Sequence, residues 1–307
     1  MSCLVKTAFM VVAVLLLAAG ALYWLRRDSA APPTMASAPK SATVPAVEAK
    51  SSEGGDRTVK TEAPPRTEGK KSPPGAEGKK ASPTMDSGIS LPIGEVLEYT
   101  AAVAKVSNVA NLRLQVAERR NFLGKSAWHL QAFAHTQNPL RMVFELDDQF
   151  DSYSDAASMA SLQYEMHLSE RGQKVDSVQR MTVTGKEPAP ANASETRVLP
   201  GTRDPIGMLQ YLRNIDWSQT RDVRGPVYDG RKLYDVQATL AGAAESVTVP
   251  AGSYPATKVD IRVFDGGTEM KDAHFSVYFA QNERRTPVLL EAVMPWSTAR
   301  VELKSSK

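Results

Sequence analysis

Four histidines are the side chains in this 307-residue sequence best suited to acid–base or metal chemistry. They are His129, His135, His167 and His274. His129 and His135 are six residues apart in a run that alternates apolar and polar residues, so on one strand they face the same side about 20 Å apart. Two ligands of one metal ion cannot be that far apart. The sequence therefore predicts no metal site and no cofactor.

The stretch ELDDQFDSYSD, residues 145–155, is the densest group of acidic side chains. Its carboxylates belong to Glu145, Asp147, Asp148, Asp151 and Asp155. The stretch lacks the glycine at position six and the closing glutamate of a calcium-binding hand. We expect a solvated acidic turn, and weak binding of a divalent cation is the alternative.

Motifs of known catalytic sites are absent from the sequence. It contains no G-x-S-x-G, no nucleotide-binding loop and no H-E-x-x-H. Cys3, the one cysteine, precedes the folded part, which therefore has neither disulfides nor thiolate ligands. We assign no catalytic, cofactor-binding or metal-binding residue. A non-catalytic role is expected, with hydrolysis of envelope polymers as the alternative.

Aromatic side chains recur along the apolar positions of the sequence. They include Tyr99, Trp128, Phe133, Phe144, Phe150, Tyr153, Tyr164 and Phe275. Such residues most often fill a core, so we expect most of them there. Others could line an apolar cavity at a barrel mouth, where a lipid or another amphipathic ligand would bind.

The elements that would position these residues are mainly strands. Residues 91–307 contain about a dozen alternating runs, at 95–106, 110–120, 126–136, 140–150, 161–170, 174–185, 232–242, 244–250, 257–266, 273–281, 286–294 and 299–306. Proline and glycine at Pro250 and Gly252 indicate a tight turn between two of these runs. The regular spacing predicts a mainly β domain, an antiparallel β-roll or barrel-like fold, rather than an alternating α/β fold.

One short helix is expected at residues 204–217. Asp204 can cap it and Pro205 suits its first position. Ile206, Leu209 and Leu212 recur at helical spacing. The helix should pack one face on the sheet or close one of its ends.

The amino-terminal part predicts an anchor and a tether. Residues 1–27 contain an uncharged run, Thr7–Leu25, bounded by Lys6, Arg26 and Arg27 and long enough for one membrane-spanning helix. A cleaved signal peptide is the alternative. Residues 28–90 have no Phe, Trp or Tyr and are rich in Pro, Ala and Lys, so we expect a disordered linker.

Charge is concentrated outside the predicted domain. The formal net charge is +3; Lys6, Arg26 and Arg27 supply three positive charges and residues 28–90 supply one more, so residues 91–307 carry −1. A basic patch for nucleic acid is therefore not expected in the domain.

Four stretches of the sequence resemble a bacterial family catalogued as domain of unknown function 3108. They are VPAGSYPATKV at 249–259, VYFAQNERRTPVLLE at 277–291, YDGRKLYDVQATL at 228–240 and GEVLEYTAAV at 94–103; the helix DPIGMLQYLRNI also has a counterpart there. The resemblance implies an exported, β-rich envelope protein and no established activity. Gln281, Asn282 and Glu283 stand where members commonly carry an aspartate, so any role of that aspartate is in doubt.

Taken together, these features predict a single-pass inner-membrane protein with a periplasmic β-rich domain at 91–307. Its expected function is a membrane-tethered binding or assembly module of the cell envelope. The expected partners are the inner membrane, through residues 7–25, and a lipid or an envelope protein. A structural adaptor that reaches across the periplasm and an envelope-polymer hydrolase are the alternatives.

Overall fold

The computed structural model describes residues 89–142, 144–182, 194–242, 244–271, 274–295 and 297–307. The predicted anchor (1–27) and all but the last two residues of the predicted linker (28–90) lie outside them. In the described ranges, no helix has both the length and the apolar character that a membrane crossing requires.

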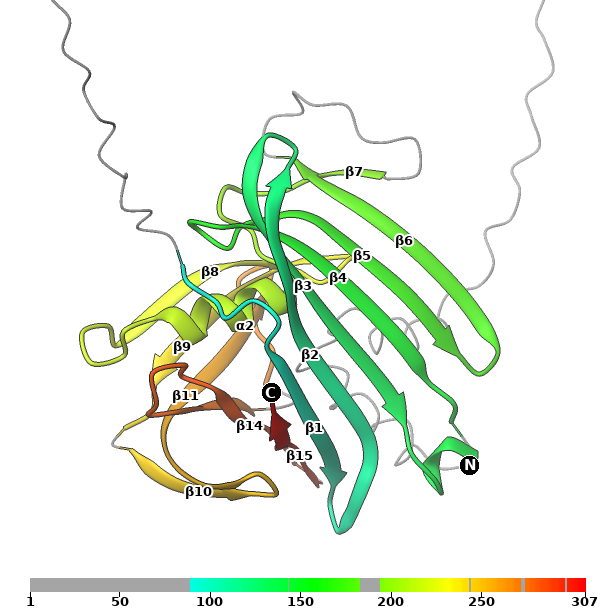
Figure 1. The fold of residues 1–307 in the computed structure, drawn as a ribbon, viewed down its shortest axis with the longest axis vertical. Coiled ribbons are helices and arrows are strands. Elements are labelled where there is room, and N and C mark those ends of the chain that lie inside the picture. The colour runs from blue at the N-terminus through cyan, green and yellow to red at the C-terminus, as the bar shows by residue number, and fades with distance from the viewer. Residues whose placement is uncertain (1–88, 143, 183–193, 243, 272–273, 296) are drawn as a thin grey trace, which may run out of the picture. The chain divides into compact units, whose positions relative to one another are not determined.

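Strands make up most of the described chain (Figure 1). They are β1 (Val96–Val103), β2 (Val106–Phe122), β3 (Lys125–Thr136), β4 (Asp147–Asp155), β5 (Ser161–Glu170), β6 (Gln173–Thr182), β7 (Ser194–Arg197), β8 (Asp222–Tyr228), β9 (Leu233–Leu240), β10 (Glu245–Val249), β11 (Gly252–Asp265), β12 (Thr268–Glu269), β13 (His274–Ala280), β14 (Pro287–Met294) and β15 (Ser297–Ser306). The helices described are η1 (Leu140–Met142), a single 3-10 turn, and α2 (Pro205–Asn214).

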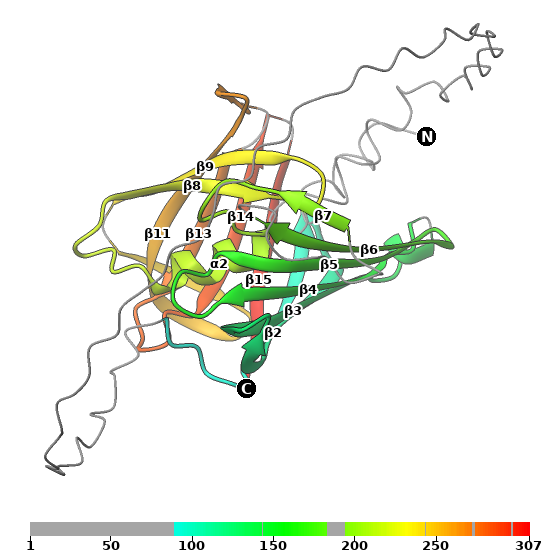
Figure 2. The same cartoon turned by 90° about the horizontal axis from the view of Figure 1, so that it is seen from above.

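All these strands belong to one sheet with the order β7-β6-β5-β4-β3-β2-β1-β15-β14-β13-β11-β9-β8. Strands β10 and β12 pair only with β11. Neighbours are antiparallel except for β6 and β7, which are parallel. Because each strand continues the right-handed twist of the last, a sheet of this width curls, as Figure 2 shows.

A short segment before α2 bridges β5 and the end strand β8 of the curled sheet. The Ser161 amide of β5 donates to the Thr202 carbonyl over 2.9 Å. The Arg203 amide donates to the Pro226 carbonyl of β8 over 3.1 Å, and the Tyr228 amide donates back to the Arg203 carbonyl. In the described residues β7 and β8 do not pair with each other, so the sheet is open. The predicted mainly β, largely antiparallel domain with one short α-helix is confirmed for these residues.

The core lies on the concave side of this sheet. Alternation places one side chain of every two inward, and Leu112, Leu130, Phe150, Tyr164 and Leu290 are fully buried there. Burial of each such side chain stabilises the fold by about 1.5–3 kcal/mol. The alternation of apolar and polar residues in the sequence therefore explains why these segments form a sheet with one buried face.

Helix α2 contacts β3, β4 and β8 on the concave side. Its amino terminus is capped as predicted: Asp204 Oδ1 accepts the amides of Ile206 and Gly207, both over 2.9 Å, and Pro205 occupies the first turn. Ile206, Leu209 and Leu212 are buried. The helix ends at Asn214 rather than at residue 217.

One predicted strand starts later than the sequence indicates, and one predicted turn is confirmed. The run predicted as a strand at 140–150 begins with η1, and the strand starts only at Asp147. Arg141 explains part of this difference, because it donates to both Glu145 and Asp147 and so folds the intervening chain back. The predicted turn at Pro250 is confirmed: Val249 pairs with Gly252, which leaves Pro250 and Ala251 as the turn residues.

Strands β7, β8 and β12 were not predicted. β8 contains Gly225 and Pro226, two residues that are rare inside strands. β8 tolerates Pro226 because β8 lies at an end of the sheet, where one side of the strand makes no hydrogen bonds to a neighbouring strand of the sheet order.

Candidate functional site

The predicted histidines are spread over three strands. His129 and His135 lie on the same face of β3, as expected from their spacing, while His167 is on β5 and His274 on β13. His129 lies between two carboxylates, with Nε2 2.7 Å from Asp151 and Nδ1 3.8 Å from Glu118. His129 also stacks on Tyr153, with ring centroids 4.5 Å apart.

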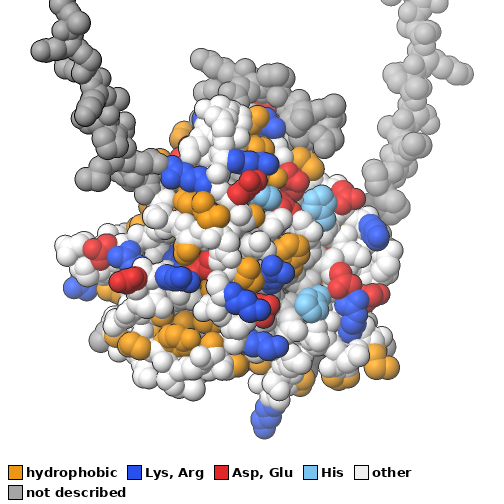
Figure 3. Space-filling model, viewed as in Figure 1, with side chains coloured by type: hydrophobic (Ala, Val, Ile, Leu, Met, Phe, Trp, Pro, Cys, Tyr) orange, Lys and Arg blue, Asp and Glu red, His pale blue; other side chains and the backbone are white. Residues whose placement is uncertain are grey.

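Metal coordination finds no support in this arrangement. Across the described ranges, no group of three or more His, Cys, Asp or Glu side chains is placed to hold a metal ion. The face of the domain seen in Figure 3 mixes acidic and basic side chains and offers no large patch of one sign.

The acidic stretch at 145–155 is not a solvated turn, which corrects the prediction. From Asp147 it forms β4, and Asp148 and Asp151 are buried. Burial alone would raise the pKa of Asp151, but hydrogen bonds from His129, Gln131 and Gln149 hold it below its ordinary value. Three donors on neighbouring positions therefore replace the water that this carboxylate loses.

Asp148 points to the other face of β4 and has a different environment. Its Oδ1 accepts the Ser169 amide over 2.9 Å, and Oδ2 has no hydrogen-bond partner in the described structure. Burial raises the pKa of Asp148 to about 7, and the nearby carboxylate of Glu170 adds to the increase. An isolated buried carboxyl of this kind is a candidate acid or base, but it does not line the pocket described below.

The eight predicted aromatic residues divide evenly between core and half-buried positions. Tyr99, Trp128, Phe150 and Tyr164 are buried, as expected for core residues. Phe133, Phe144, Tyr153 and Phe275 are half-buried. None of the eight lines the pocket described below.

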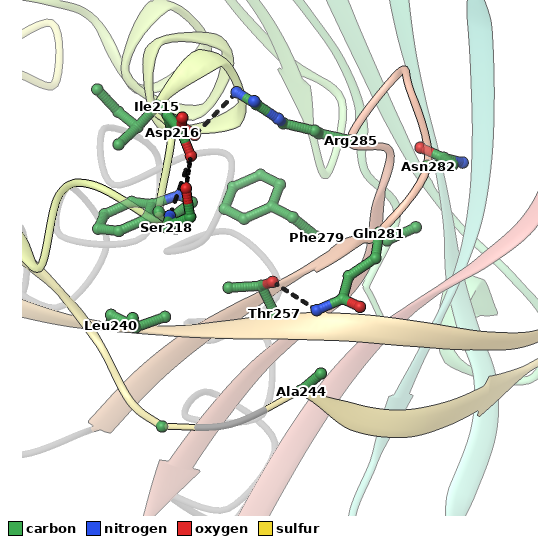
Figure 4. Close-up of a pocket in the computed structure, with 13 residues that line it drawn as sticks. Ile215, Asp216, Ser218, Leu240, Ala244, Thr257, Phe279, Gln281, Asn282 and Arg285 are labelled. Carbon is green, nitrogen blue, oxygen red and sulfur yellow. Dashed lines mark hydrogen bonds between the residues drawn. The ribbon is translucent and has the colours of Figure 1, made fainter.

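A pocket of about 400 Å³ lies beyond the carboxyl-terminal end of α2 (Figure 4). Its lining comes from four separate segments of the chain. The apolar lining residues are Ile215, Trp217, Leu240, Ala244, Phe279 and Ala280, and the others are Asp216, Ser218, Gly242, Thr257, Gln281, Asn282 and Arg285. Apolar carbon thus faces polar groups across a concave surface, which is typical of a small-molecule site.

The pocket wall that follows α2, residues 215–218, is fixed by hydrogen bonds to carbonyls at the end of the helix. Trp217 Nε1 donates to the Leu212 carbonyl over 3.1 Å. Arg285 Nη1 donates to the carbonyls of Asn214 and Ile215, over 3.1 and 3.0 Å. A cation at the carboxyl terminus of a helix is also favoured by the helix dipole. The β13–β14 turn and the end of α2 therefore form one rigid rim.

Asp216 is the acidic group of this rim. Its Oδ1 accepts the amide and the hydroxyl of Ser218, over 3.0 and 2.7 Å. These bonds, with a smaller contribution from the Arg285 cation, hold the pKa of Asp216 below its ordinary value. The rim thus presents one carboxylate, one guanidinium and the amides of Gln281 and Asn282.

A buried ion pair lies behind the rim. Arg213 of α2 forms a two-pronged contact with Glu95, at 2.5 and 2.8 Å, and both side chains are almost fully buried. Arg213 also donates to the Arg284 carbonyl over 2.7 Å. Tyr99 donates to the Pro287 carbonyl over 2.8 Å. The start of β1, the end of α2 and the β13–β14 turn are joined by these contacts.

The family model described as protein of unknown function DUF3108 matches residues 98–304, more than half of the chain. The chain belongs to this family. The resemblance drawn from the sequence is therefore confirmed. No curated protein matches the chain.

The stretches that carry the resemblance come together at the pocket of this DUF3108 domain. The stretch 249–259 supplies Thr257, 277–291 supplies residues 279–282 and Arg285, and 228–240 supplies Leu240. The stretch 94–103 supplies Glu95 and Tyr99, which hold the rim from behind. Gln281 and Asn282, two of the three residues that depart from the family pattern, line the pocket itself.

Solved structures resemble the DUF3108 domain only distantly. A β-barrel-like protein of domain of unknown function DUF1849 from Brucella abortus is 10% identical with a TM-score of 0.46, covering 71% of this chain and 98% of its own. A protein described as a lipoprotein from Parabacteroides distasonis is 14% identical, with a TM-score of 0.36 and coverages of 73% and 100%. A protein described as exported, with a YmcC-like fold, from Bacteroides fragilis is 9% identical, with a TM-score of 0.27 and coverages of 72% and 98%. At these values the likeness carries no argument about function.

Sequence reasoning did not single out the aromatic residues that line the pocket. Trp217 follows the helix end by three residues, and Phe279 sits in the strand that carries a family stretch. The available signal for Trp217 was an aromatic residue shortly after the end of a helix. Nothing in the sequence tied it to Phe279.

Proposed function

We propose that this protein is a membrane-tethered, non-catalytic binding module of the cell envelope that holds an amphipathic ligand in the pocket beyond α2. The ligand's apolar part would lie against Ile215, Trp217 and Leu240, and its polar end would reach the rim. The observation that carries this proposal is the pocket, which combines an apolar floor with a hydrogen-bonding rim.

The proposed location is the inner membrane with the domain in the periplasm. It is supported by the uncharged run Thr7–Leu25, which is long enough to span a bilayer, and by the sequence of residues 28–90, which suits a flexible tether. A tethered pocket would meet ligands at a distance from the membrane surface.

Native mass spectrometry of the full chain, mixed with an extract of bacterial amphiphiles, tests this function. We expect one bound molecule per chain. Thr257→Trp should abolish the adduct because it fills the pocket from β11. Gln281→Trp, at an exposed rim position, is a second blocking variant that threatens the fold less. Thr239→Trp on β9, outside the pocket, is the matched control and should keep the adduct.

No adduct in the wild type, or an adduct that survives both blocking variants, would contradict the proposal. Retained thermal stability of each variant shows that the blocked chains are folded. The comparison thus separates a filled pocket from a lost fold.

A structural adaptor is the second candidate, and one observation favours it. In the described residues β7 pairs only with β6, and its four residues are mostly exposed, so its outer edge could receive a strand from a partner protein. Deletion of residues 40–85 should then abolish function in cells, because a shorter tether cannot reach the partner. A pure ligand-binding module would keep working after that deletion.

A further inference from the structure

We propose that the pocket takes a single-chain amphiphile with a carboxylate head, in the chemical class of the fatty acids, in preference to a two-chain phospholipid or a cationic amphiphile. This inference rests on the proposed function and adds the ligand class. It follows from the size of the pocket and from the hydrogen-bond donors at its rim.

The size of the pocket sets the number of chains. Its volume of about 400 Å³ lies near the lower end of the range in which proteins hold drug-sized ligands, roughly 300–1,000 Å³. One alkyl chain with a compact head fits in such a volume. The second chain of a phospholipid would remain in water, where its exposed methylene groups make binding less favourable than burial of a single chain.

The orientation of the bound amphiphile follows from the two different sides of the pocket. Ile215 and Leu240 are half-buried and offer apolar surface beside Trp217. Figure 4 shows Arg285 and Asn282 on the opposite side from Leu240, with Ile215 beside Arg285, so the tail of the ligand would end at Leu240 and its head would lie at Arg285. A uniformly apolar ligand would leave the polar side without partners.

Arg285 is the group that favours a carboxylate. Its Nη1 donates to the Asn214 and Ile215 carbonyls, which fixes the guanidinium at the rim. In the described part of the chain, Nε and Nη2 have no hydrogen-bond partner. A guanidinium presents five N–H donors in a planar fork, so two of its nitrogens remain available to bind a carboxylate.

Asp216 opposes an anionic head, but its carboxylate is already engaged by its own turn. Ser218 donates to Oδ1 from both its amide and its hydroxyl. Gln281 and Asn282 donate to the hydroxyls of Thr257 and Thr286, over 3.3 and 3.5 Å, and each amide keeps one further N–H for a ligand beside Arg285. The hydrogen-bond donors on the side of Arg285 therefore favour a carboxylate head. Asp216 still repels that head, so its replacement by a neutral residue provides a test.

Isothermal titration of the full chain compares dodecanoate with dodecylammonium, both below the concentrations at which they form micelles. Thr257→Trp measures binding outside the pocket. We expect pocket binding of dodecanoate to be at least about fivefold tighter than that of dodecylammonium. Vesicles of a two-chain lipid with the same chain length should bind equally to the wild type and to Thr257→Trp, because that lipid does not enter the pocket.

Asp216→Asn should strengthen dodecanoate binding about twofold to fivefold, because it removes a negative charge from the rim. Glu283→Gln, on the same turn as Arg285 but outside the pocket, is the matched control and should leave the affinity unchanged. This pair of variants keeps Arg285 and the end of α2 intact.

Equal affinities of dodecanoate and dodecylammonium for the pocket would overturn the inference of a carboxylate head. The proposed function would still hold. Pocket binding of the two-chain lipid as tight as that of dodecanoate would overturn the single-chain inference. If no amphiphile gives binding that depends on Thr257, both the inference and the proposed function are wrong.

Discussion

Arg213 and Glu95 form the most deeply buried ion pair described in the domain, with side chains 2% and 1% exposed. A buried pair adds little net stability over an apolar pair, but removal of one partner leaves a charge without compensation. The pair also fixes the end of α2 against β1, where the pocket rim begins. Its role is to position the rim.

Replacement of Arg213 with Met should lower the free energy of unfolding by about 3–5 kcal/mol, because the Glu95 carboxylate stays buried alone. Urea denaturation at pH 7 measures the loss. The double variant Glu95→Leu/Arg213→Met should recover much of it. Arg224→Met, which breaks the exposed pair with Asp235, is the control and should cost less than about 1 kcal/mol. A loss at Arg213 no larger than that of the control would contradict the positioning role.

Asp148 makes stability depend on pH. Its folded-state pKa of about 7 lies above its ordinary value of 3.8, so the folded state binds a proton that the unfolded state releases. The contribution of Asp148 to stability is therefore fully present below about pH 4 and is lost as the pH rises through 7. Each pKa unit corresponds to about 1.4 kcal/mol, so the total loss is on the order of a few kcal/mol.

Asp148→Asn should remove most of this dependence between pH 4 and pH 8, because a neutral side chain keeps the acceptor for the Ser169 amide. Thermal unfolding over that pH range measures the difference from the wild type. Asp147→Asn is the control: Arg141 holds the pKa of Asp147 below its ordinary value, so its contribution to stability is lost only as the pH falls below about 4. Equal slopes in Asp148→Asn and wild type would show that Asp148 is not the cause.

At the scale of elements, α2 is held at both ends by side chains. Asp204 caps its amino terminus and also accepts the hydroxyls of Ser152 and Ser161 from β4 and β5. Arg285 and Trp217 bind the carbonyls of its last turn and the residue that follows. Because a ten-residue helix is marginal by itself, these contacts keep it folded and correctly placed.

Gly207 shows how closely α2 packs on the sheet. A Cβ at this position would lie 2.9 Å from Ser154 Oγ and 3.2 Å from the Met159 carbonyl. Helix propensity alone predicts that Gly207→Ala stabilises the protein by about 1 kcal/mol. We expect the opposite sign, because the Met159 backbone cannot move freely.

Chemical denaturation of Gly207→Ala gives the sign directly. The double variant Gly207→Ala/Ser154→Ala removes the closer contact and should recover part of the loss. A gain in stability from Gly207→Ala alone would show that α2 can shift away from β4.

The strands could be predicted because burial of one face requires apolar side chains at every second position, as in β1 and β3. The helix could be predicted because Asp204 and Pro205 mark its start. β8 could not, because Gly225 and Pro226 are unfavourable in a strand until the end of a sheet accommodates them. Asp151 was assigned to a solvated turn because a row of carboxylates usually stays in water; its donors His129 and Gln131 come from another strand.

The pocket could not be predicted because its lining is set by the order of the strands. Ile215, Leu240, Thr257 and Phe279 come from four segments that meet only because β9, β11 and β13 are neighbours. Alternation predicts which face a residue occupies, but not which strand lies beside it.

The whole molecule combines a predicted membrane anchor, a predicted tether and a domain whose described part contains a pocket that suits a ligand. The domain carries a formal charge near neutrality, while the surplus of positive charge lies in the first 90 residues. Such a division suits a protein whose amino-terminal part contacts an anionic membrane and whose domain meets an uncharged or weakly charged environment.

The deciding measurement is the quenching of Trp217 fluorescence by bromine-labelled dodecanoate, in a full chain in which Phe replaces Trp24 and Trp296, so that Trp217 at the pocket and Trp128, buried elsewhere, are its two tryptophans. The measurement compares the full chain with the variants Trp217→Phe and Trp128→Phe. The account predicts saturable quenching that Trp217→Phe abolishes and Trp128→Phe preserves. Quenching that is absent, or that persists unchanged in Trp217→Phe, would contradict a ligand in this pocket.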